Sequence, residues 1–333
     1  LLVPKYSEIS SRKEIDISAQ VGNLKFTTPI ISSPMDTVTE AQMALKMYKA
    51  GGLGIIHRYN TIKQQVEIVR DIRDELESCS SSGVNAIAAA IGSSGDFFER
   101  ATELYHAGAR VLCIDVAHGH HCLVERAIKS LRDAFNNNIT VVAGNVATSR
   151  GYKNISDWGA DAVRIGIGGG SICSTRIQTG HGVPTFQSVY NCRDTDGATI
   201  IADGGIKTAG DIVKALAAGA DMVMLGSMLA ATSESPGEVF AELDGTKYKV
   251  YRGMASPEAQ NAWRGKVSSR EGVSTTIPYK GPVDKILDNL QQNIRSGLSY
   301  SGARSIRDLQ ALASFICQSS AGAHESSTHI LSR

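Results

Sequence analysis

The 333-residue sequence predicts an α/β fold, a closed (β/α)8 barrel that forms a single domain. Short apolar segments recur along the chain, and polar–apolar stretches with helical spacing lie between them. Apolar segments without alternation are typical of strands that are buried on both faces of a parallel sheet. Eight such units favour a closed barrel, and an open doubly wound sheet remains the alternative.

The expected strands are spaced by about one strand–helix unit each. In chain order they cover residues 29–33, 52–57, 85–91, 111–116, 140–145, 162–167, 199–203 and 222–226. Helical patterns between them include residues 97–107, 123–135 and 209–218. Polar and glycine-rich segments follow most of the strands, at the end of a parallel barrel where active sites are found.

The composition excludes several classes of protein. The 34 basic and 33 acidic residues give a net charge of +1, without the basic surplus that is typical of nucleic-acid binding. Hydrophobic residues make up 42% of the chain, more than disordered proteins contain, yet no apolar run approaches the roughly 18 residues that span a bilayer. We therefore expect a cytoplasmic protein that binds neither nucleic acid nor a membrane.

Cysteine and glycine usage narrows the class further. The six cysteines contain no Cys-x-x-Cys pair and are spread over the chain, which argues against a disulfide framework and against a zinc site. Most of them are expected to be small buried hydrophobic residues. The 33 glycines are about one residue in ten, above the usual ~7%, and indicate places that need positive φ or a close approach of the backbone.

The segments after the seventh and eighth expected strands have the composition of a phosphate site. Gly205 and Gly226 would let backbone N–H groups approach an anion, and Ser227 adds a hydroxyl donor. Asp203 ends an apolar segment, where it can accept hydrogen bonds from ribose hydroxyls. The alternatives are that the glycines serve tight turns and that Asp203 caps the next helix.

The segment after the sixth expected strand, residues 166–176, places Cys173 behind a run of glycines. Such a loop can present a covalent nucleophile at the barrel mouth, and nearby N–H groups and Arg176 would favour its thiolate. The alternative is a structural cysteine. Four histidines are candidate bases, although a histidine in a loop is more often solvated: His118, His120, His121 and His181.

Residues 166–176, Gly-Ile-Gly-Gly-Gly-Ser-Ile-Cys-Ser-Thr-Arg, resemble the catalytic-cysteine loop of the IMP dehydrogenase and GMP reductase family. The resemblance continues over nearly the whole chain, through residues 1–4, 35–40, 51–58, 115, 144–146, 201–205, 225–229, 234–237, 248–254 and 278–281. It implies a (β/α)8 barrel, usually a homotetramer, that binds a purine 5′-monophosphate and a nicotinamide cofactor.

The resemblance also implies roles for individual residues. Cys173 would attack C2 of the purine and form a covalent thioimidate, with Thr175 and Glu271 as the other catalytic residues. The substrate would be held by Ser171, Asp203, Gly205, Gly226, Ser227, Tyr251, Gly253 and Met254. The nicotinamide cofactor would contact Ser32, Ser33, Asp115 and Asn145.

A potassium ion is a further implication of the resemblance. Its ligands would be the carbonyl groups of Gly168, Gly170 and Cys173. The site would be completed by a neighbouring subunit, through Glu325 and Ser326 of a C-terminal tail at about residues 317–333. Ser327 stands where many members of the family have histidine, a departure that bears on this site.

The two activities of the family differ in the fate of the thioimidate. Dehydrogenases hydrolyse it to XMP with an adjacent Arg-Tyr pair in a mobile flap, whereas reductases form it from GMP by expelling ammonia and reduce it to IMP with NADPH. In the expected flap, about residues 253–281, Arg264 is followed by Gly265 and Arg270 by Glu271. Since losing a general base typically costs ~10² to 10⁴ in rate, this flap favours GMP reductase.

Two alternatives accompany this prediction. IMP dehydrogenase, which uses NAD, is supported by residues 37–40, 51–52, 55–58 and 325–326, which resemble dehydrogenases more closely. A non-enzymatic nucleotide-binding barrel would have lost Cys173, Thr175 or Glu271, and all three are present. The tandem CBS regulatory module of most dehydrogenases cannot fit into residues 59–84, so we expect no regulation through it.

Overall fold

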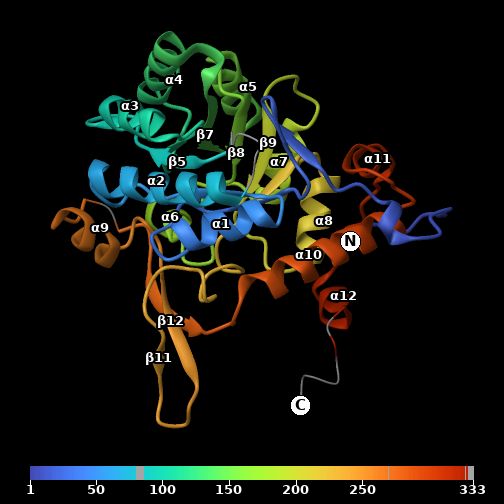
Figure 1. Cartoon of the computed structure of the whole chain (residues 1–333). Coiled ribbons are helices and arrows are strands. Elements are labelled where there is room, and N and C mark those ends of the chain that lie inside the picture. Colours follow the sequence, from blue (N-terminus) through green and yellow to red (C-terminus); the bar gives the residue numbers. More distant parts are fainter. Residues whose placement is uncertain (80–85, 269, 327, 329–333) are drawn as a thin grey trace.

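The computed structural model describes residues 1–79, 86–268, 270–326 and 328. Eight parallel strands close into a barrel, and helices pack around it (Figure 1). In barrel order the strands are β10 (Met222–Leu225), β3 (Ile30–Ser32), β4 (Leu53–Ile56), β5 (Ala88–Ile91), β6 (Val111–Asp115), β7 (Thr140–Val146), β8 (Ala162–Ile165) and β9 (Thr199–Asp203). The (β/α)8 barrel predicted from the sequence is confirmed, and each expected strand overlaps one of these.

Helices follow the strands, as the apolar periodicity predicts. The three expected helices correspond to α3 (Phe97–Ala107), α4 (Cys122–Phe135) and α8 (Ala209–Ala217). The other helices are η1 (Arg12–Glu14), α1 (Ala41–Lys49), α2 (Ile62–Cys79), η2 (Asn136–Asn138), α5 (Ser149–Asp157), α6 (Thr175–Thr179), α7 (Thr185–Cys192), α9 (Pro257–Arg264), α10 (Val283–Tyr300), α11 (Ile306–Leu312) and α12 (Ser320–Glu325). The strands outside the barrel are β1 (Ala19–Val21), β2 (Leu24–Phe26), β11 (Phe240–Ala241), β12 (Lys247–Arg252) and β13 (Ser274–Pro278).

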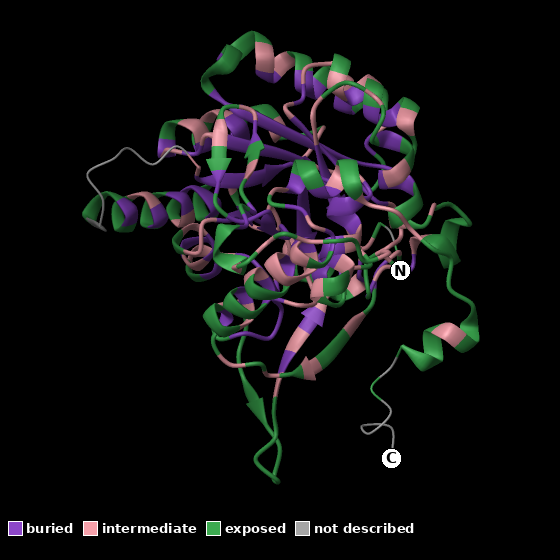
Figure 2. Ribbon diagram, turned by 90° about the vertical axis from the view of Figure 1, so that its right-hand side faces the viewer, coloured by how far each residue is buried: buried purple, intermediate pink, exposed green. Residues whose placement is uncertain are grey.

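Side chains alternate between the inside of the barrel and the layer beneath the helices. In β6, Cys113 joins the interior cluster, whereas its neighbours Leu112 and Ile114 join the cluster under the helices. The β1–β2 hairpin adds Val21 and Phe26 to the interior cluster, which also contains the first residues of β5, β6, β8 and β10. The hairpin therefore covers the amino ends of the strands, and the carboxyl ends are left for a site. Figure 2 shows the buried residues concentrated in the barrel.

A small sheet and a helix follow the last barrel strand. β12 pairs antiparallel with β11 on one side and with β13 on the other, and α9 lies between β12 and β13 in the chain. Ser256 caps α9, Pro257 occupies its first turn and Gly265, with a φ of +61°, ends it. The expected flap thus contains a helix and a paired strand. The β11–β12 hairpin and α12 project from the body of the protein (Figures 1 and 2).

Candidate active site

Loops at the carboxyl ends of the barrel strands line a cavity of ≈ 720 Å³. This volume lies in the range of small-molecule and cofactor sites. The cavity brings together most of the residues that the sequence predicts for the site: Ser33, Asp115, Asn145, Gly168, Gly170, Cys173, Thr175, Asp203, Tyr251, Gly253, Met254 and Glu271.

Cys173 is partly buried in the loop after β8, and its sulfur lies 3.1 Å from Thr175 Oγ1. The Cys173 amide donates to the Gly170 carbonyl at 3.1 Å, which turns the loop back on itself. Gly168 has a φ of +74°, a backbone conformation that a glycine adopts without strain. A hydroxyl at hydrogen-bonding distance from a thiol can accept a hydrogen bond from the thiol or donate one to its thiolate.

The flap pairs with the cysteine loop through the backbone. The Ser174 amide donates to the Glu271 carbonyl at 2.8 Å, and the Val273 amide donates to the Ile172 carbonyl at 3.0 Å. These bonds flank a β-bridge between Cys173 and Gly272. The pairing explains why Glu271, far along the chain, lines the same cavity as the cysteine.

Arg176 does not contact the Cys173 thiol, contrary to the expectation from the sequence. Its Nη2 donates to the Val183 carbonyl at 2.7 Å and to the Ile167 carbonyl at 3.1 Å, and its Nε donates to the same Ile167 oxygen at 3.2 Å. Arg176 therefore ties together the two ends of the loop that carries the cysteine. The polar group that meets the thiol is Thr175.

Tyr251 marks the corner of the cavity where the sequence predicts a phosphate. The side chain is 4% exposed, and its hydroxyl lies 3.5 Å from Ser171 Oγ. Burial raises the pKa of Tyr251, and Ser171 offsets part of this effect while Asp203 adds to it, so the phenol is a neutral donor. A Cβ added to Gly226 would lie 3.1 Å from the Tyr251 hydroxyl, so a glycine at this position leaves room for that hydroxyl.

Five of the expected ligand-binding residues lie outside the cavity lining: Ser32, Ser171, Gly205, Gly226 and Ser227. Gly205 has a φ of +83°, and the Ser227 carbonyl accepts a hydrogen bond from Lys280 Nζ. Ser32, expected at the cofactor, is completely buried, and Thr39 Oγ1 donates to its hydroxyl at 2.8 Å. Ser32 therefore does not line the cavity, whereas its neighbour Ser33 does.

Arg164 is absent from the residues that the sequence predicts for the site. Its guanidinium is buried inside the barrel, where it donates to Asp203 Oδ2 at 2.9 Å and to Asp115 Oδ1 at 2.5 Å. Asn145 Nδ2 donates to the same Asp203 oxygen at 2.7 Å. Burial alone would lower the pKa of Arg164, but Asp203 and Asp115 raise it well above its usual value. The sequence does contain an indication of Arg164: it is a basic residue within the apolar strand Ala-Val-Arg-Ile, and charged residues are seldom buried unless they are paired.

An aromatic stack forms part of the cavity lining. The rings of Tyr59 and Trp263 are parallel, with their centres 4.2 Å apart. The Arg58 and Arg264 guanidinium carbons lie 5.7 and 5.1 Å from the centre of the Trp263 ring. The stack joins the loop after β4 to the flap helix α9, a contact that neither segment reveals in the sequence.

The four candidate histidines lie outside the lining of the cavity. His120 Nε2 meets Asn154 Nδ2 at 2.9 Å, and His121 caps α4 by accepting from the Leu123 amide. Partial burial lowers the pKa of His118, and the neighbouring His120, His121 and His181 lower it further. In the described residues, the carboxylate that shares the cavity with Cys173 and Thr175 from the flap is Glu271.

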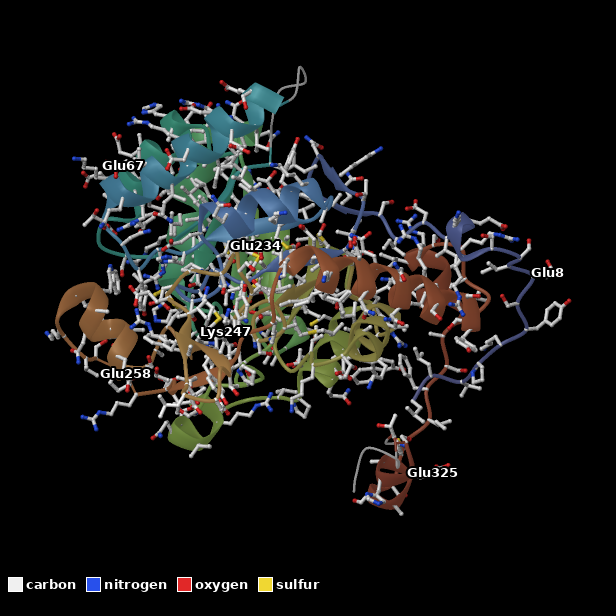
Figure 3. The ribbon with its side chains drawn as sticks, turned by 60° about the horizontal axis from the view of Figure 1, so that its bottom comes forward. Glu8, Glu67, Glu234, Lys247, Glu258 and Glu325 are labelled. Atoms are coloured by element: carbon white, nitrogen blue, oxygen red, sulfur yellow. The ribbon has the colours of Figure 1, made fainter. Side chains whose placement is uncertain are left out.

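The tail residues expected at a potassium ion lie apart from the cysteine loop of their own chain. Glu325 is at the end of α12, which projects away from the barrel (Figure 3), and Ser326 follows it. Ser327 lies outside the described residues. The described residues contain no group of three or more His, Cys, Asp or Glu that could hold a metal ion, and the expected potassium ligands are mainly backbone carbonyls.

Each cysteine whose side chain the structure describes is a free thiol: Cys113, Cys122, Cys173, Cys192 and Cys317. Cys113 and Cys192 are buried, as small hydrophobic residues, while Cys122 and Cys317 are exposed. Among the described residues, no helix has the length and apolar character needed to cross a membrane.

The chain matches the IMP dehydrogenase / GMP reductase domain model over residues 1–329. It is 34% identical to inosine-5′-monophosphate dehydrogenase of Nitrosopumilus maritimus (strain SCM1), over 99% of this chain and 96% of that protein. It is 33% identical to GMP reductase of Leishmania major, over 100% of this chain and 96% of that protein. These alignments run over 461 and 474 residues, so both relatives contain segments with no counterpart in the 333-residue chain.

A solved structure shares the fold over almost the whole chain. It is the crystal structure of a cysteine-to-alanine variant of GMP reductase from Trypanosoma brucei in complex with guanosine 5′-monophosphate. The TM-score is 0.92 at 30% sequence identity, with 99% of this chain and 96% of the other covered. The chain therefore belongs to the IMP dehydrogenase / GMP reductase family of NAD(P)-dependent oxidoreductases.

Proposed function

We propose that the chain is a GMP reductase, which converts GMP and NADPH to IMP, ammonia and NADP⁺. The flap carries the proposal: its backbone brings Glu271 to the cavity in which Cys173 and Thr175 lie 3.1 Å apart. The flap has no adjacent Arg-Tyr pair to activate water. A thiol, a hydroxyl and a carboxylate provide a nucleophile and a proton path, which is what the expulsion of ammonia requires.

In the proposed reaction, Cys173 attacks C2 of the purine ring. The new S–C2 bond replaces the bond from C2 to the exocyclic amino group, and the thiol proton leaves with that group as ammonia. Thr175, beside the sulfur, passes this proton on, and Glu271 holds the proton that the leaving amine takes up. When NADPH is bound, it supplies a hydride to C2, after which Cys173 leaves as a thiolate and IMP is released.

Substrate binding in this proposal uses three groups of residues in and beside the cavity. The Tyr251 and Ser171 hydroxyls, with the backbone at Gly205, Gly226 and Ser227, would hold the 5′-phosphate. Asp203 would accept from the ribose hydroxyls, and Gly253 and Met254 would contact the base. Hydroxyl groups and exposed backbone N–H groups are donors that can hold a phosphate.

The same cavity contains groups that fit a nicotinamide cofactor. The Asp115 carboxylate lines the cavity with 16% of its side chain exposed, so it can accept from ribose hydroxyls. Ser33 and Asn145 line the cavity as well, and we propose that they contact the nicotinamide ribose. Binding next to the purine would place a hydride donor on the face opposite the thiol.

IMP dehydrogenase is the alternative within the family. It would oxidise IMP with NAD and hydrolyse the thioimidate to XMP. The 34% identity to the Nitrosopumilus enzyme and the dehydrogenase-like residues 37–40 favour it. In that case Thr175 and Glu271 would have to activate water. The flap lacks the Arg-Tyr pair of dehydrogenases, because Arg264 is followed by glycine.

The assembly is also a proposal. We propose that the chain acts as a single barrel domain, in the cytoplasm, within a homotetramer. Glu325 and Ser326 project from their own barrel and would reach the cysteine loop of a neighbouring subunit, where carbonyls of Gly168, Gly170 and Cys173 would hold potassium. The interval of residues 80–87 between α2 and β5 is too short for the tandem CBS module.

The test compares two substrate pairs while the absorbance of the reduced nicotinamide is followed. We expect GMP to cause oxidation of NADPH, with release of ammonia and IMP. IMP with NAD is expected to give no sustained NADH, and Cys173→Ala is expected to bind GMP without turnover. Sustained NADH production from IMP would overturn the assignment to GMP reductase in favour of the dehydrogenase.

A further inference from the structure

Three charged side chains point into the barrel from β6, β8 and β9: Asp115, Arg164 and Asp203. Alternation along each strand accounts for this direction, because successive side chains of a strand face opposite sides. The residue two positions earlier in each strand belongs to the interior cluster, namely Cys113, Ala162 and Ile201. A positive charge therefore stands between two negative charges at the carboxyl end of the barrel.

Gly144 in β7 lets the Arg164 side chain, which starts in β8, reach across β7 to Asp115 in β6. In the sheet, Gly144 pairs with Asp115 on one side and with Arg164 on the other. A Cβ added to Gly144 would lie 2.6 Å from Arg164 Cβ and 2.7 Å from the Arg164 carbonyl oxygen, closer than real contacts. Since this position carries no side chain, the guanidinium spans β7 and meets Asp115.

Arg164 uses one oxygen of each carboxylate. Nη1 donates to Asp115 Oδ1 at 2.5 Å, and Nη2 and Nε donate to Asp203 Oδ2 at 2.9 and 3.3 Å. In the described part of the chain, no hydrogen bond uses Asp203 Oδ1, and Asp115 Oδ2 has Arg58 Nε at 3.8 Å. Hydrogen bonds from the described residues thus reach one oxygen of each carboxylate, and Asp203 Oδ1 in particular is left for a ligand in the cavity.

We propose that Arg164 is a positioning residue that holds the substrate-side carboxylate, Asp203, and the cofactor-side carboxylate, Asp115, on one guanidinium. The proposal rests on the function proposed above, in which these two carboxylates accept hydroxyl groups of two different nucleotides. One side chain then sets the distance between the two ribose sites. Its loss weakens the binding of both nucleotides through the two carboxylates that it holds.

The experiment measures dissociation constants for GMP and for NADP⁺ by calorimetry on the full chain. Removing a charged hydrogen-bond donor costs roughly a tenfold to hundredfold loss in affinity, and we expect Arg164→Gln to raise both constants by about tenfold or more. Arg164→Lys keeps the charge but replaces the planar fork by a single ammonium group, so we expect it to raise both constants less than Arg164→Gln does.

A matched control separates positioning from stability. Arg132 pairs with Asp161 outside the cavity and also bonds to backbone carbonyls, so Arg132→Gln removes a comparable ion pair. It is expected to lower the melting temperature and leave both dissociation constants unchanged. If Arg164→Gln also lowers the melting temperature but leaves both dissociation constants unchanged, Arg164 has only a structural role and the proposal is overturned.

Arg164→Gln leaves two carboxylates without their cation and can therefore fail to fold. A second variant covers this case. Arg164→Gln combined with Asp115→Asn removes one charge of each sign. We expect its dissociation constant for GMP to exceed that of Asp115→Asn alone by about tenfold. Equal constants would overturn the proposal. If GMP and NADP⁺ bind and depend on Arg164 but GMP and NADPH give no turnover, the reductase assignment fails and the positioning role stands.

Discussion

The sulfur of Cys173 and the hydroxyl oxygen of Thr175 lie 3.1 Å apart in the loop that follows β8. A thiol becomes a strong nucleophile when its proton leaves, and this hydroxyl is the polar group positioned to pass that proton on. Thr175→Val keeps the shape of the side chain and removes the hydroxyl. We expect kcat to fall by about 10² to 10⁴, with KM for GMP little changed.

Steady-state kinetics with GMP and NADPH measure this effect. Thr179→Val is the control, because the Thr179 hydroxyl bonds to the Thr175 carbonyl within α6 and lies on the exposed side of the same segment. A wild-type kcat for Thr175→Val would remove its hydroxyl from the proton path.

Glu271→Gln tests the flap carboxylate. The substitution keeps the size of the side chain and removes the carboxyl group that, in the proposed reaction, exchanges a proton with the leaving amine. General acid–base catalysis typically contributes ~10² to 10⁴ in rate, so a loss of this order is expected in GMP-dependent NADPH oxidation. Glu258→Gln, on the exposed face of α9 in the same flap (Figure 3), should retain wild-type activity. A loss of less than about fivefold for Glu271→Gln would point to another proton donor.

Tyr251→Phe tests the phosphate corner. The Tyr251 side chain is 4% exposed, and its hydroxyl lies beside Ser171 and Gly226. Losing one hydrogen bond to a charged group costs about 1.5 to 3 kcal/mol, so KM for GMP should rise by about tenfold or more while kcat changes little. The same assay at varied NADPH should show an unchanged KM for the cofactor. A defect confined to kcat would assign Tyr251 to the chemistry instead.

Alkaline stability is expected to depend on Cys113 inside the barrel. Burial raises the pKa of this thiol from 9.0 to about 11, and the nearby Arg164 offsets only part of the effect. The folded protein holds the proton more tightly than the unfolded chain, so this stabilisation is present below the unfolded pKa and is lost as pH rises through about 11. The free energy of unfolding is expected to fall by roughly 2 to 3 kcal/mol across this window.

Urea denaturation on either side of the window measures this change. Cys113→Ala should show a smaller fall than wild type, and the difference isolates Cys113 from Cys192, whose pKa burial also raises to about 11. Cys122→Ala removes an exposed thiol and should match wild type. An identical pH dependence in Cys113→Ala and wild type would contradict the assignment.

The barrel could be predicted from the sequence because its strands are buried on both faces and therefore stand out as continuous apolar segments. The cysteine loop could be predicted because its glycines and Cys173 occur together in one short segment. The contact between this loop and Glu271 depends on pairing of the flap with residues 172–174, which only the folded chain provides.

Other features of the site needed the structure. Arg164 gains its role from its register with Gly144 and Asp115, and a single basic residue in a strand does not reveal that register. Ser32 and Ser33 are adjacent and chemically alike, but strand alternation buries the first and turns the second toward the cavity. Arg176 lies close to Cys173 in the sequence, yet its guanidinium is taken by two carbonyl groups of the loop.

The central claim, that the purine bound to Cys173 is reduced and not hydrolysed, is tested by mixing the chain with IMP and NADP⁺ without ammonia. A reductase running backwards transfers hydride from C2 of IMP and leaves the purine on the cysteine. Mass spectrometry is predicted to show one nucleotide on the Cys173 peptide, which added ammonia releases as GMP, and no adduct in Cys173→Ala. Accumulation of XMP over many turnovers, with no stable adduct, would contradict the reductase account.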